Sequence, residues 1–316
     1  MKLLKRYKNL PGSPAKIHNP LKWMRFLSGM LSAKPPAVPN DFVLPRDEVL
    51  SAYQILSGAD SMTWLGHAAF LLKLNRKNIL LDPYLADYAS PLPGMGPKRF
   101  TPPGMRVEDL PPIDILIISH NHYDHLDAKT IAALPGKENI QVIVPLSLGK
   151  FFHGFGYRHI HELDWYQMWS QDKITVRALP AYHFSQRYLF MANTTLWASY
   201  AISTADKNIY FSGDTAYGPV FKELGEKYGP FDYALLGIGA YEPQELMCSV
   251  HTTPEEAVTI GQELNARTIV GMHWGTVILS HEPAFEPPER FKKAAARNNI
   301  AEENCWIMKI GETRKI

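Results

Sequence analysis

Four potential metal ligands lie within six consecutive positions of one short stretch. In ISHNHYDHLD, Ile118 to Asp127, these are His120, His122, Asp124 and His125. The preceding run, IDILIIS, is short, aliphatic and β-branched, so we expect a buried strand there. The polar side chains begin where that strand ends, which is where sites form in α/β sheets. Imidazole nitrogens and carboxylate oxygens suit Zn²⁺ and other first-row divalent metals, so the stretch predicts a metal centre.

Three further candidates follow other expected strands in the same way. His183 comes after KITVRALP, Asp214 after NIYFSG and His273 after RTIVGM. Neither cysteine of the chain stands at such a position, so every candidate would bind metal through nitrogen or oxygen. Together with the first stretch, five histidines and two aspartates are available to surround metal ions.

A ligand set of this size can fill two adjacent metal sites. The expected arrangement is one site of His120, His122 and His183, a second site of Asp124, His125 and His273, and Asp214 as a bridge through its two carboxylate oxygens. Two cations about 3.5–4 Å apart can lower the pKa of a water molecule, hold a substrate oxygen and neutralise developing charge. We expect two Zn²⁺ per chain, although Fe or Mn suits the same donors.

Two other polar residues adjoin apolar strands. Asp82 ends ILLDP, and we expect it to accept an N–H from a ligand histidine and so orient that ring. The alternative for Asp82 is a turn-forming Asp-Pro. His67, in WLGHAAF, could touch the site, but a hydrogen-bonded core residue is the favoured interpretation, and it is not counted among the ligands.

The pattern of elements predicts an α/β (α+β) fold. Of the 316 residues, 46% are hydrophobic, enough for a sizeable core. From about Ser61, each half of the chain begins with strands and continues in strand–helix alternation. Two sheets sandwiched between helices, in four αββα layers, fit this order better than a doubly wound sheet. We therefore expect a catalytic domain over residues 61–316 and a separate N-terminal segment over residues 1–60.

The N-terminal segment is basic and contains an amphipathic stretch. Eight Lys and Arg residues and no acidic residue precede Asp41, which leaves 25 basic against 31 acidic residues in the remainder. Asn19-Pro20 predicts a helix start, and a helix over Leu21 to Leu31 would gather one broad apolar face. That face comprises Trp23, Met24, Phe26, Leu27, Met30 and Leu31. We expect residues 1–34 to contact an anionic membrane surface; packing of the helix on its own domain is the alternative.

The cysteine content and the hydropathy of the chain indicate in which cellular compartment the protein is expected. Cys248 and Cys305 form no CxxC pair, which favours a reducing compartment. No run approaches the ~18 apolar residues of a membrane span, and the basic N-terminus has no apolar signal-peptide core. The expected location is the cytoplasm, with peripheral attachment to a membrane.

Several sequence motifs resemble a known family. HxHxDH, the later histidines and the aspartate of SGD are similar to the metal motifs of the metallo-β-lactamase superfamily. Within it, the chain resembles the N-acyl-phosphatidylethanolamine-hydrolysing phospholipase D family through WLGHA, LLDP, MGPKRF, LPPIDILIISHNHYDHLD, ELDW, SGDTAYGPVF, GPFDYALLGIGAYEP, MHWGT and FEPP. The resemblance covers roughly Ser61 to the C-terminus. Residues 1–60 match loosely, and Gln244 to Val250 diverge.

This resemblance implies a metallo-β-lactamase-like sandwich and a metal-dependent phosphoric diester hydrolase. The implied reaction hydrolyses N-acyl-phosphatidylethanolamine to phosphatidic acid and an N-acylethanolamine by metal-activated water. Asp124, Asp214 and His251 are the implied catalytic residues, and Tyr241, Glu242 and His251 the implied substrate-binding residues; His251 could instead cap or pack. The chain has no His-x-Lys, so a phosphohistidine route is not expected.

The same site chemistry leaves other functions open. One alternative is a metal-dependent lactonase, or a small-molecule or nucleotide phosphodiesterase, of the same superfamily. Another is a metal-stabilised binding protein without activity, which the intact set of seven ligands disfavours. We expect a phospholipid substrate and no nucleic-acid partner, and leave a homodimer open.

Overall fold

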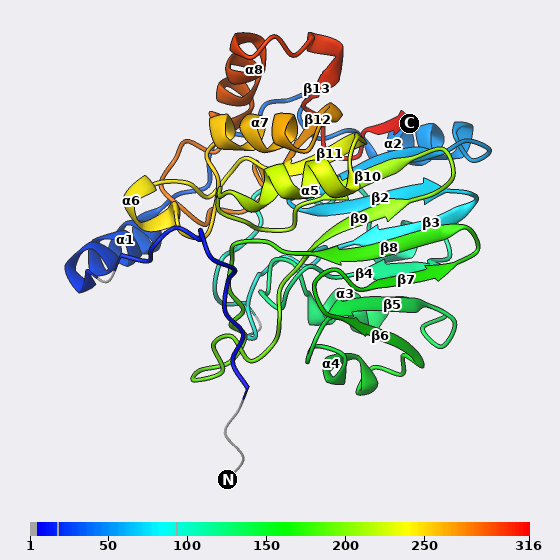
Figure 1. The fold of residues 1–316 in the computed structure, drawn as a ribbon, viewed down its shortest axis with the longest axis horizontal. Helices are drawn as coiled ribbons and strands as arrows, with labels where there is room; N and C mark the ends of the chain where they lie inside the picture. The colour runs from blue at the N-terminus through cyan, green and yellow to red at the C-terminus, as the bar shows by residue number, and fades with distance from the viewer. Residues whose placement is uncertain (1–4, 18, 93) are drawn as a thin grey trace.

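Two seven-stranded mixed sheets form the centre of the molecule (Figure 1). The computed structural model describes residues 5–17, 19–92 and 94–316. The first sheet has the order β14-β1-β2-β3-β4-β5-β6, antiparallel from β14 to β3 and parallel from β3 to β6. Its strands are β1 (Ser61–Gly66), β2 (Ala69–Leu74), β3 (Lys77–Leu81), β4 (Ile115–Ile117), β5 (Gln141–Pro145), β6 (His159–Leu163) and β14 (Thr313–Lys315).

The second sheet repeats this plan. Its order is β13-β12-β11-β10-β9-β8-β7, antiparallel from β7 to β10 and parallel from β10 to β13. The strands are β7 (Met168–Gln171), β8 (Ile174–Leu179), β9 (Ser199–Ser203), β10 (Asn208–Phe211), β11 (Phe231–Gly237), β12 (Ala266–Met272) and β13 (Cys305–Trp306). In both sheets the strands that precede the candidate ligands are buried over most of their length, as their aliphatic composition requires.

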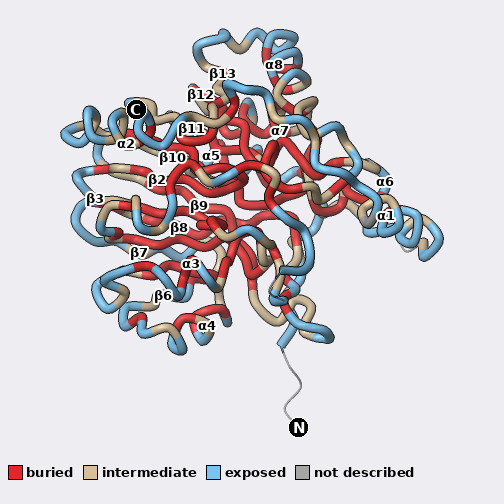
Figure 2. Tube along the Cα trace, turned by 180° about the vertical axis from the view of Figure 1, so that it is seen from behind, coloured by how far each residue is buried: buried red, intermediate tan, exposed pale blue. Residues whose placement is uncertain are grey.

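Helices cover the outer face of each sheet, which confirms the four-layer αββα sandwich. One apolar cluster fills the space between the sheets and continues under α5, α7 and α8. A second lies between the first sheet and α2, α3 and α4. Figure 2 shows the buried residues concentrated in these inner layers. The helices are α1 (Pro20–Ser32), α2 (Arg46–Ile55), α3 (Ala128–Ala133), α4 (Lys150–His153), α5 (Val220–Tyr228), α6 (Gln244–Met247), α7 (Pro254–Glu263) and α8 (Pro287–Arg297).

Local sequence sets where two of these helices begin. Asn19 accepts a hydrogen bond from the backbone N–H of Lys22, with Pro20 as the first residue of α1. Thr253 and Glu256 exchange side-chain and backbone hydrogen bonds in a capping box at the start of α7. In the described part of the chain, no helix is long and apolar enough to cross a bilayer.

Helix α1 divides its apolar side chains between the protein and solvent. Phe26 is buried against Leu246, Met247 and Val250 beside α6, and Met30 packs at the edge of this cluster. Lys22 forms an ion pair with Glu245, and the ring of His281 donates to the Phe26 carbonyl at 3.1 Å. The outward side chains, more than half exposed, are Leu21, Met24 and Leu27. Residues 1–4 and the side chain of Leu31 lie outside the described part of the structure.

The chain segments that follow β4 and β10 pass close to each other at Gly213. Gly213, two residues after the end of β10, has φ of +53°, a left-handed conformation that favours glycine. A Cβ at this position would lie 2.5 Å from the Cβ of Ser119, the residue before His120. The missing side chain therefore lets Asp214 and His120 come together from different sheets.

We predict that Gly213→Ala destabilises the protein by roughly 1–3 kcal/mol, because the added methyl group forces strain at this junction. Thermal unfolding followed by circular dichroism measures the change. Gly58→Ala is the matched control, since a Cβ there has no neighbour within 4 Å; its effect should stay within about 0.5 kcal/mol. Equal melting temperatures for Gly213→Ala and the wild type would contradict the close approach.

Candidate metal centre

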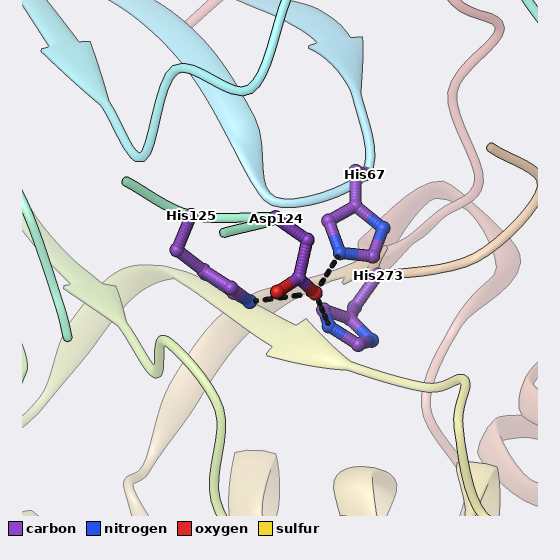
Figure 3. A group of neighbouring side chains, drawn as sticks. All are labelled: His67, Asp124, His125 and His273. Carbon is purple, nitrogen blue, oxygen red and sulfur yellow. Dashed lines mark hydrogen bonds and ion pairs between the residues drawn. The ribbon is translucent and has the colours of Figure 1, made fainter. Parts of the chain in front are cut away.

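The candidate ligands converge at the edge where the two sheets meet. The loops after β4, β8, β10 and β12 bring their side chains into two adjoining groups, and within each group the candidate ligand atoms lie within 4.8 Å of one another. The first group is His120, His122, His183 and Asp214. The second is His67, Asp124, His125 and His273 (Figure 3). All seven residues expected from the sequence are therefore brought together, and His67 joins them.

Asp214 lies between the two groups. Its Oδ2 is 3.6 Å from His183 Nε2 in the first group and 3.1 Å from His125 Nε2 in the second. Its Oδ1 is 3.2 Å from His273 Nε2. The carboxylate is almost fully buried, so nearby histidines and any bound cations supply its charge compensation. This geometry is what a bridging carboxylate requires.

His67 reaches the centre from the turn between β1 and β2. Its Nε2 hydrogen-bonds with Asp124 Oδ2 at 2.9 Å, and its ring centroid lies 4.0 Å from that of His273 (Figure 3). The His67 backbone donates to Thr276 Oγ1 and accepts from the His273 N–H, so the loop after β12 holds it in place. The sequence allowed His67 to touch the site but favoured a core role, and His67 was left out of the expected ligands. The available signal was a histidine in a two-residue turn beside glycine.

Asp82 orients two histidine side chains, His125 directly and His120 through Ser119. Its Oδ2 is 2.7 Å from His125 Nδ1, and its Oδ1 accepts the backbone N–H of Ser119 at 2.7 Å. The Ser119 hydroxyl bonds to Asp82 and also lies 2.9 Å from His120 Nδ1. With Nδ1 engaged, the Nε2 atoms of both rings face the centre. Asp82 therefore occupies the orienting position expected from the sequence, whereas the contribution of Ser119 was not foreseen.

His183 is held by segments far away in the sequence. Its Nδ1 donates to the Val250 carbonyl at 2.9 Å. Asn9 donates to the His183 carbonyl at 3.0 Å and accepts the His183 N–H at 3.1 Å. The Asn9 side chain also accepts from the indole N–H of Trp197. The N-terminal segment thus helps to build the centre, which its composition did not indicate.

Burial and neighbouring charges set the protonation of the centre. Burial lowers the pKa of His122 to about 4 and that of His120 and His183 well below the ordinary value, so these rings are neutral, as metal ligands must be. Burial acts against ionisation of Asp214, but His125 and His273 hold its pKa well below the usual range. Asp214 in turn helps to raise the pKa of His273 to about 9, against burial.

Unsatisfied atoms show that the residues fit a divalent cation. Within the described residues, His125 Nε2, His273 Nε2 and Asp214 Oδ1 are buried without a hydrogen-bond partner. Leaving such atoms unpaired costs roughly 1–3 kcal/mol each. Cations among them would satisfy all three and would displace the histidine protons. The donor set of nitrogen and oxygen atoms suits zinc, iron or manganese.

The expected substrate residues do not all reach the centre. His251 does: its Nδ1 is 3.9 Å from Asp214 Oδ2, and its side chain is 14% exposed, so it lies at the open side. The hydroxyl of Tyr241 instead donates to Glu286 at 2.9 Å. Glu242 accepts the backbone N–H of Gln244. Tyr241 and Glu242 therefore make their hydrogen bonds away from the cluster.

Comparison with known proteins gives consistent relatives. Residues 77–274 match a protein family described as Beta-lactamase superfamily domain. The chain is 39% identical over 263 residues to N-acyl-phosphatidylethanolamine-hydrolyzing phospholipase D 1 of Caenorhabditis elegans, covering 79% of this chain and 74% of that protein. It is 33% identical over 258 residues to the mitochondrial N-acyl-phosphatidylethanolamine-hydrolyzing phospholipase D of Saccharomyces cerevisiae, covering 79% of this chain and 55% of that protein.

Solved structures share the fold at lower sequence identity. Igni18, a metallo hydrolase from Ignicoccus hospitalis, superposes with a TM-score of 0.61 at 21% identity, covering 82% of this chain and 98% of that one. An isothiocyanate hydrolase from Delia radicum gut bacteria gives a TM-score of 0.65 at 20% identity, covering 81% and 99%. These two likenesses support the sandwich fold alone.

We predict that Asp214→Asn weakens metal binding by more than about tenfold, because the neutral amide no longer balances cations in either group. Equilibrium dialysis against Zn²⁺ with elemental analysis measures the metal bound. Added Zn²⁺ should also raise the melting temperature of the wild type more than that of the variant. Asp206→Asn, at an exposed turn, is the matched control and should bind like the wild type. Unchanged Zn²⁺ binding in Asp214→Asn would contradict a bridging role.

Proposed function

The chain belongs to the metallo-β-lactamase superfamily as a metal-dependent hydrolase, and from this premise we propose that it is a phosphodiesterase of the phospholipase D type. The proposed substrate is N-acyl-phosphatidylethanolamine, and the products are phosphatidic acid and an N-acylethanolamine. The observation that carries the proposal is the position of Asp214, a buried carboxylate that faces two separate groups of ligands. Such paired sites suit in-line displacement at phosphorus. The similarity to two phospholipases D of this name supports the substrate.

Each ligand residue has a defined task in this proposal. His120, His122 and His183 would hold one ion, Asp124, His125 and His273 would hold the other, and Asp214 would offset charge from its place between the two groups. When bound, the two ions, Zn²⁺ in our proposal, lower the pKa of a water molecule and offset the negative charge of the phosphoryl group. Asp82 and the Val250 carbonyl fix the orientation of the rings. Asp124 is itself oriented by His67.

His251 is the proposed contact to the substrate phosphate. It lies beside Asp214 but is not needed by either set of ligands. Because its side chain is partly exposed at the open side, it can hydrogen-bond a phosphoryl oxygen. Water attacks phosphorus, the bond from phosphorus to the ethanolamide oxygen breaks, and the N-acylethanolamine leaves after taking up a proton.

We expect hydrolysis in ¹⁸O-labelled water to place the label in phosphatidic acid, because water attacks phosphorus directly. Mass spectrometry of the products of purified, Zn²⁺-loaded protein with vesicles of N-acyl-phosphatidylethanolamine measures its position. Added primary alcohol should give little phosphatidyl alcohol, since no phosphohistidine forms. Label in the N-acylethanolamine or in a fatty acid would contradict the proposal, and turnover of lactones without turnover of diesters would favour a lactonase.

A membrane partner accompanies a lipid substrate, and the N-terminal segment is the proposed contact. The outward side chains of α1 form an apolar strip: Leu21 is 63%, Met24 59% and Leu27 56% exposed. Arg25 is exposed on the same helix. Apolar area and basic charge together give reversible binding to anionic membranes. The proposal places the protein in the cytoplasm as a peripheral membrane protein.

We predict that Leu21→Ser with Met24→Ser weakens binding to anionic vesicles while leaving metal content and hydrolysis of a soluble short-chain diester unchanged. Vesicle co-sedimentation measures binding, which should also fall with salt because exposed charges are screened within about 8 Å at physiological ionic strength. Phe26→Ala is the contrast: its ring packs on α6, so it should lower the melting temperature. If the double variant binds vesicles like the wild type, α1 does not contact the membrane and serves only to pack on the domain.

A further inference from the structure

Three consecutive large side chains protrude from the loop between β8 and β9. Tyr188, Leu189 and Phe190, which we name the 188–190 tip, are 59%, 81% and 87% exposed. Burying such side chains would stabilise the fold, so their exposure leaves that stabilisation unused. Contiguous exposed apolar side chains of this kind mark an interaction surface.

The tip is held in its outward position. Phe190 has φ of +65°, a strained backbone conformation for a bulky residue. Arg6 donates to the carbonyls of Phe190, at 3.1 Å, and Ala192, at 2.5 Å. The Tyr7 N–H donates to the Asn193 carbonyl at 2.8 Å. The N-terminal segment therefore braces the loop in a conformation that presents Leu189 and Phe190 to solvent.

The segments that form and brace the tip carry no acidic residue. The loop from Ala181 to Ala198 contains no aspartate or glutamate, and its Arg187 is buried, where it donates to the Asn121 and Leu126 carbonyls. The bracing segment adds Lys5, Arg6 and Lys8, again without an acidic residue. Exposed apolar side chains among basic residues fit the interface of an anionic bilayer, where the apolar groups insert and the cations meet phosphates.

The tip adjoins the open side of the metal centre. The same loop carries His183 and Phe184, and the Phe184 ring lies 4.5 Å from that of His122. Phe184 also packs against the cluster that anchors α1 through Phe26. In Figure 1, α1 and the loop between β8 and β9 project on the same side of the molecule, and α2 lies on the opposite side. The centre therefore lies close to both projections.

A neighbouring loop extends this surface. Leu92 and Met95 are 54% and 62% exposed. The loop that carries them lies near the tip, since Tyr88 and Pro91 line the same groove as Tyr188. Leu92 and Met95 therefore add exposed apolar side chains to this part of the surface.

We infer that the 188–190 tip and the outward strip of α1 are two contacts of one docking face for an anionic phospholipid bilayer, which lies across the opening of the metal centre. A diester lipid would then reach His251 from the bilayer without crossing water. That consequence rests on the proposed function, whereas docking itself needs no hydrolysis.

The test removes the tip without straining the loop. Leu189→Ser with Phe190→Gly deletes both side chains, and glycine suits the positive φ at position 190. Co-sedimentation with vesicles of phosphatidylcholine and phosphatidylglycerol should show affinity weakened by about tenfold or more. Ile55→Ser is the matched control for Leu189→Ser, since Ile55 is 78% exposed on α2, at the opposite side; its vesicle affinity should equal that of the wild type.

Other readouts separate the outcomes. The double variant should keep its melting temperature and its hydrolysis of a soluble short-chain diester. A double variant that binds vesicles as tightly as the wild type would overturn the inference. This holds also if that variant loses activity on the soluble diester or dissociates from an oligomer, because the tip would then serve another role. If the wild type hydrolyses no diester but binds vesicles through the tip, the inference stands and the proposed function fails. If the wild type hydrolyses N-acyl-phosphatidylethanolamine in detergent micelles but its vesicle binding does not depend on the tip, the proposed function stands and the inference fails.

Discussion

A carboxylate enclosed by imidazoles is the interaction on which the arrangement of this molecule depends. Asp214 is buried at the junction of the sheets, and its negative charge requires partners from both. Ionised carboxylates are costly to remove from water unless they are paired. The histidines meet that requirement only if the loops after β4, β8, β10 and β12 end at one edge. The two sheets must therefore pack in a single register, and Gly213 makes the close approach sterically allowed.

Residues outside the ligand set hold the ligand side chains in place through hydrogen bonds. Asp82 and Ser119 hold the rings of His120 and His125, and the turn between β1 and β2 delivers His67 to Asp124. Each support begins in an apolar strand that is buried on both faces, so the strands fix the backbone before any side chain is oriented. The packed strands of the two sheets thus set the positions of the ligand side chains in the centre.

The parts that the sequence predicted share a local cause. The ligands were found because each follows a buried strand, and the start of α1 because Asn19-Pro20 is a capping pair. The parts that were missed depend on contacts between distant segments. Asn9 reaches His183 across 174 positions, and no pattern near Asn9 signals it. Likewise the spacing of the apolar residues in α1 predicted one apolar face. Which of these residues stay exposed depends on the packing of Phe26 beside α6, which the spacing does not indicate.

The two hydrogen bonds between Asn9 and His183 link the segment before α1 to a histidine of the metal centre. Removal of the segment around Asn9, for example by a peptidase, would therefore loosen a histidine of the metal centre. The Ile316 N–H instead bonds to the Asp60 carbonyl beside β1, away from α1 (Figure 1). Changes near Asn9 therefore reach the metal centre more directly than changes near Ile316.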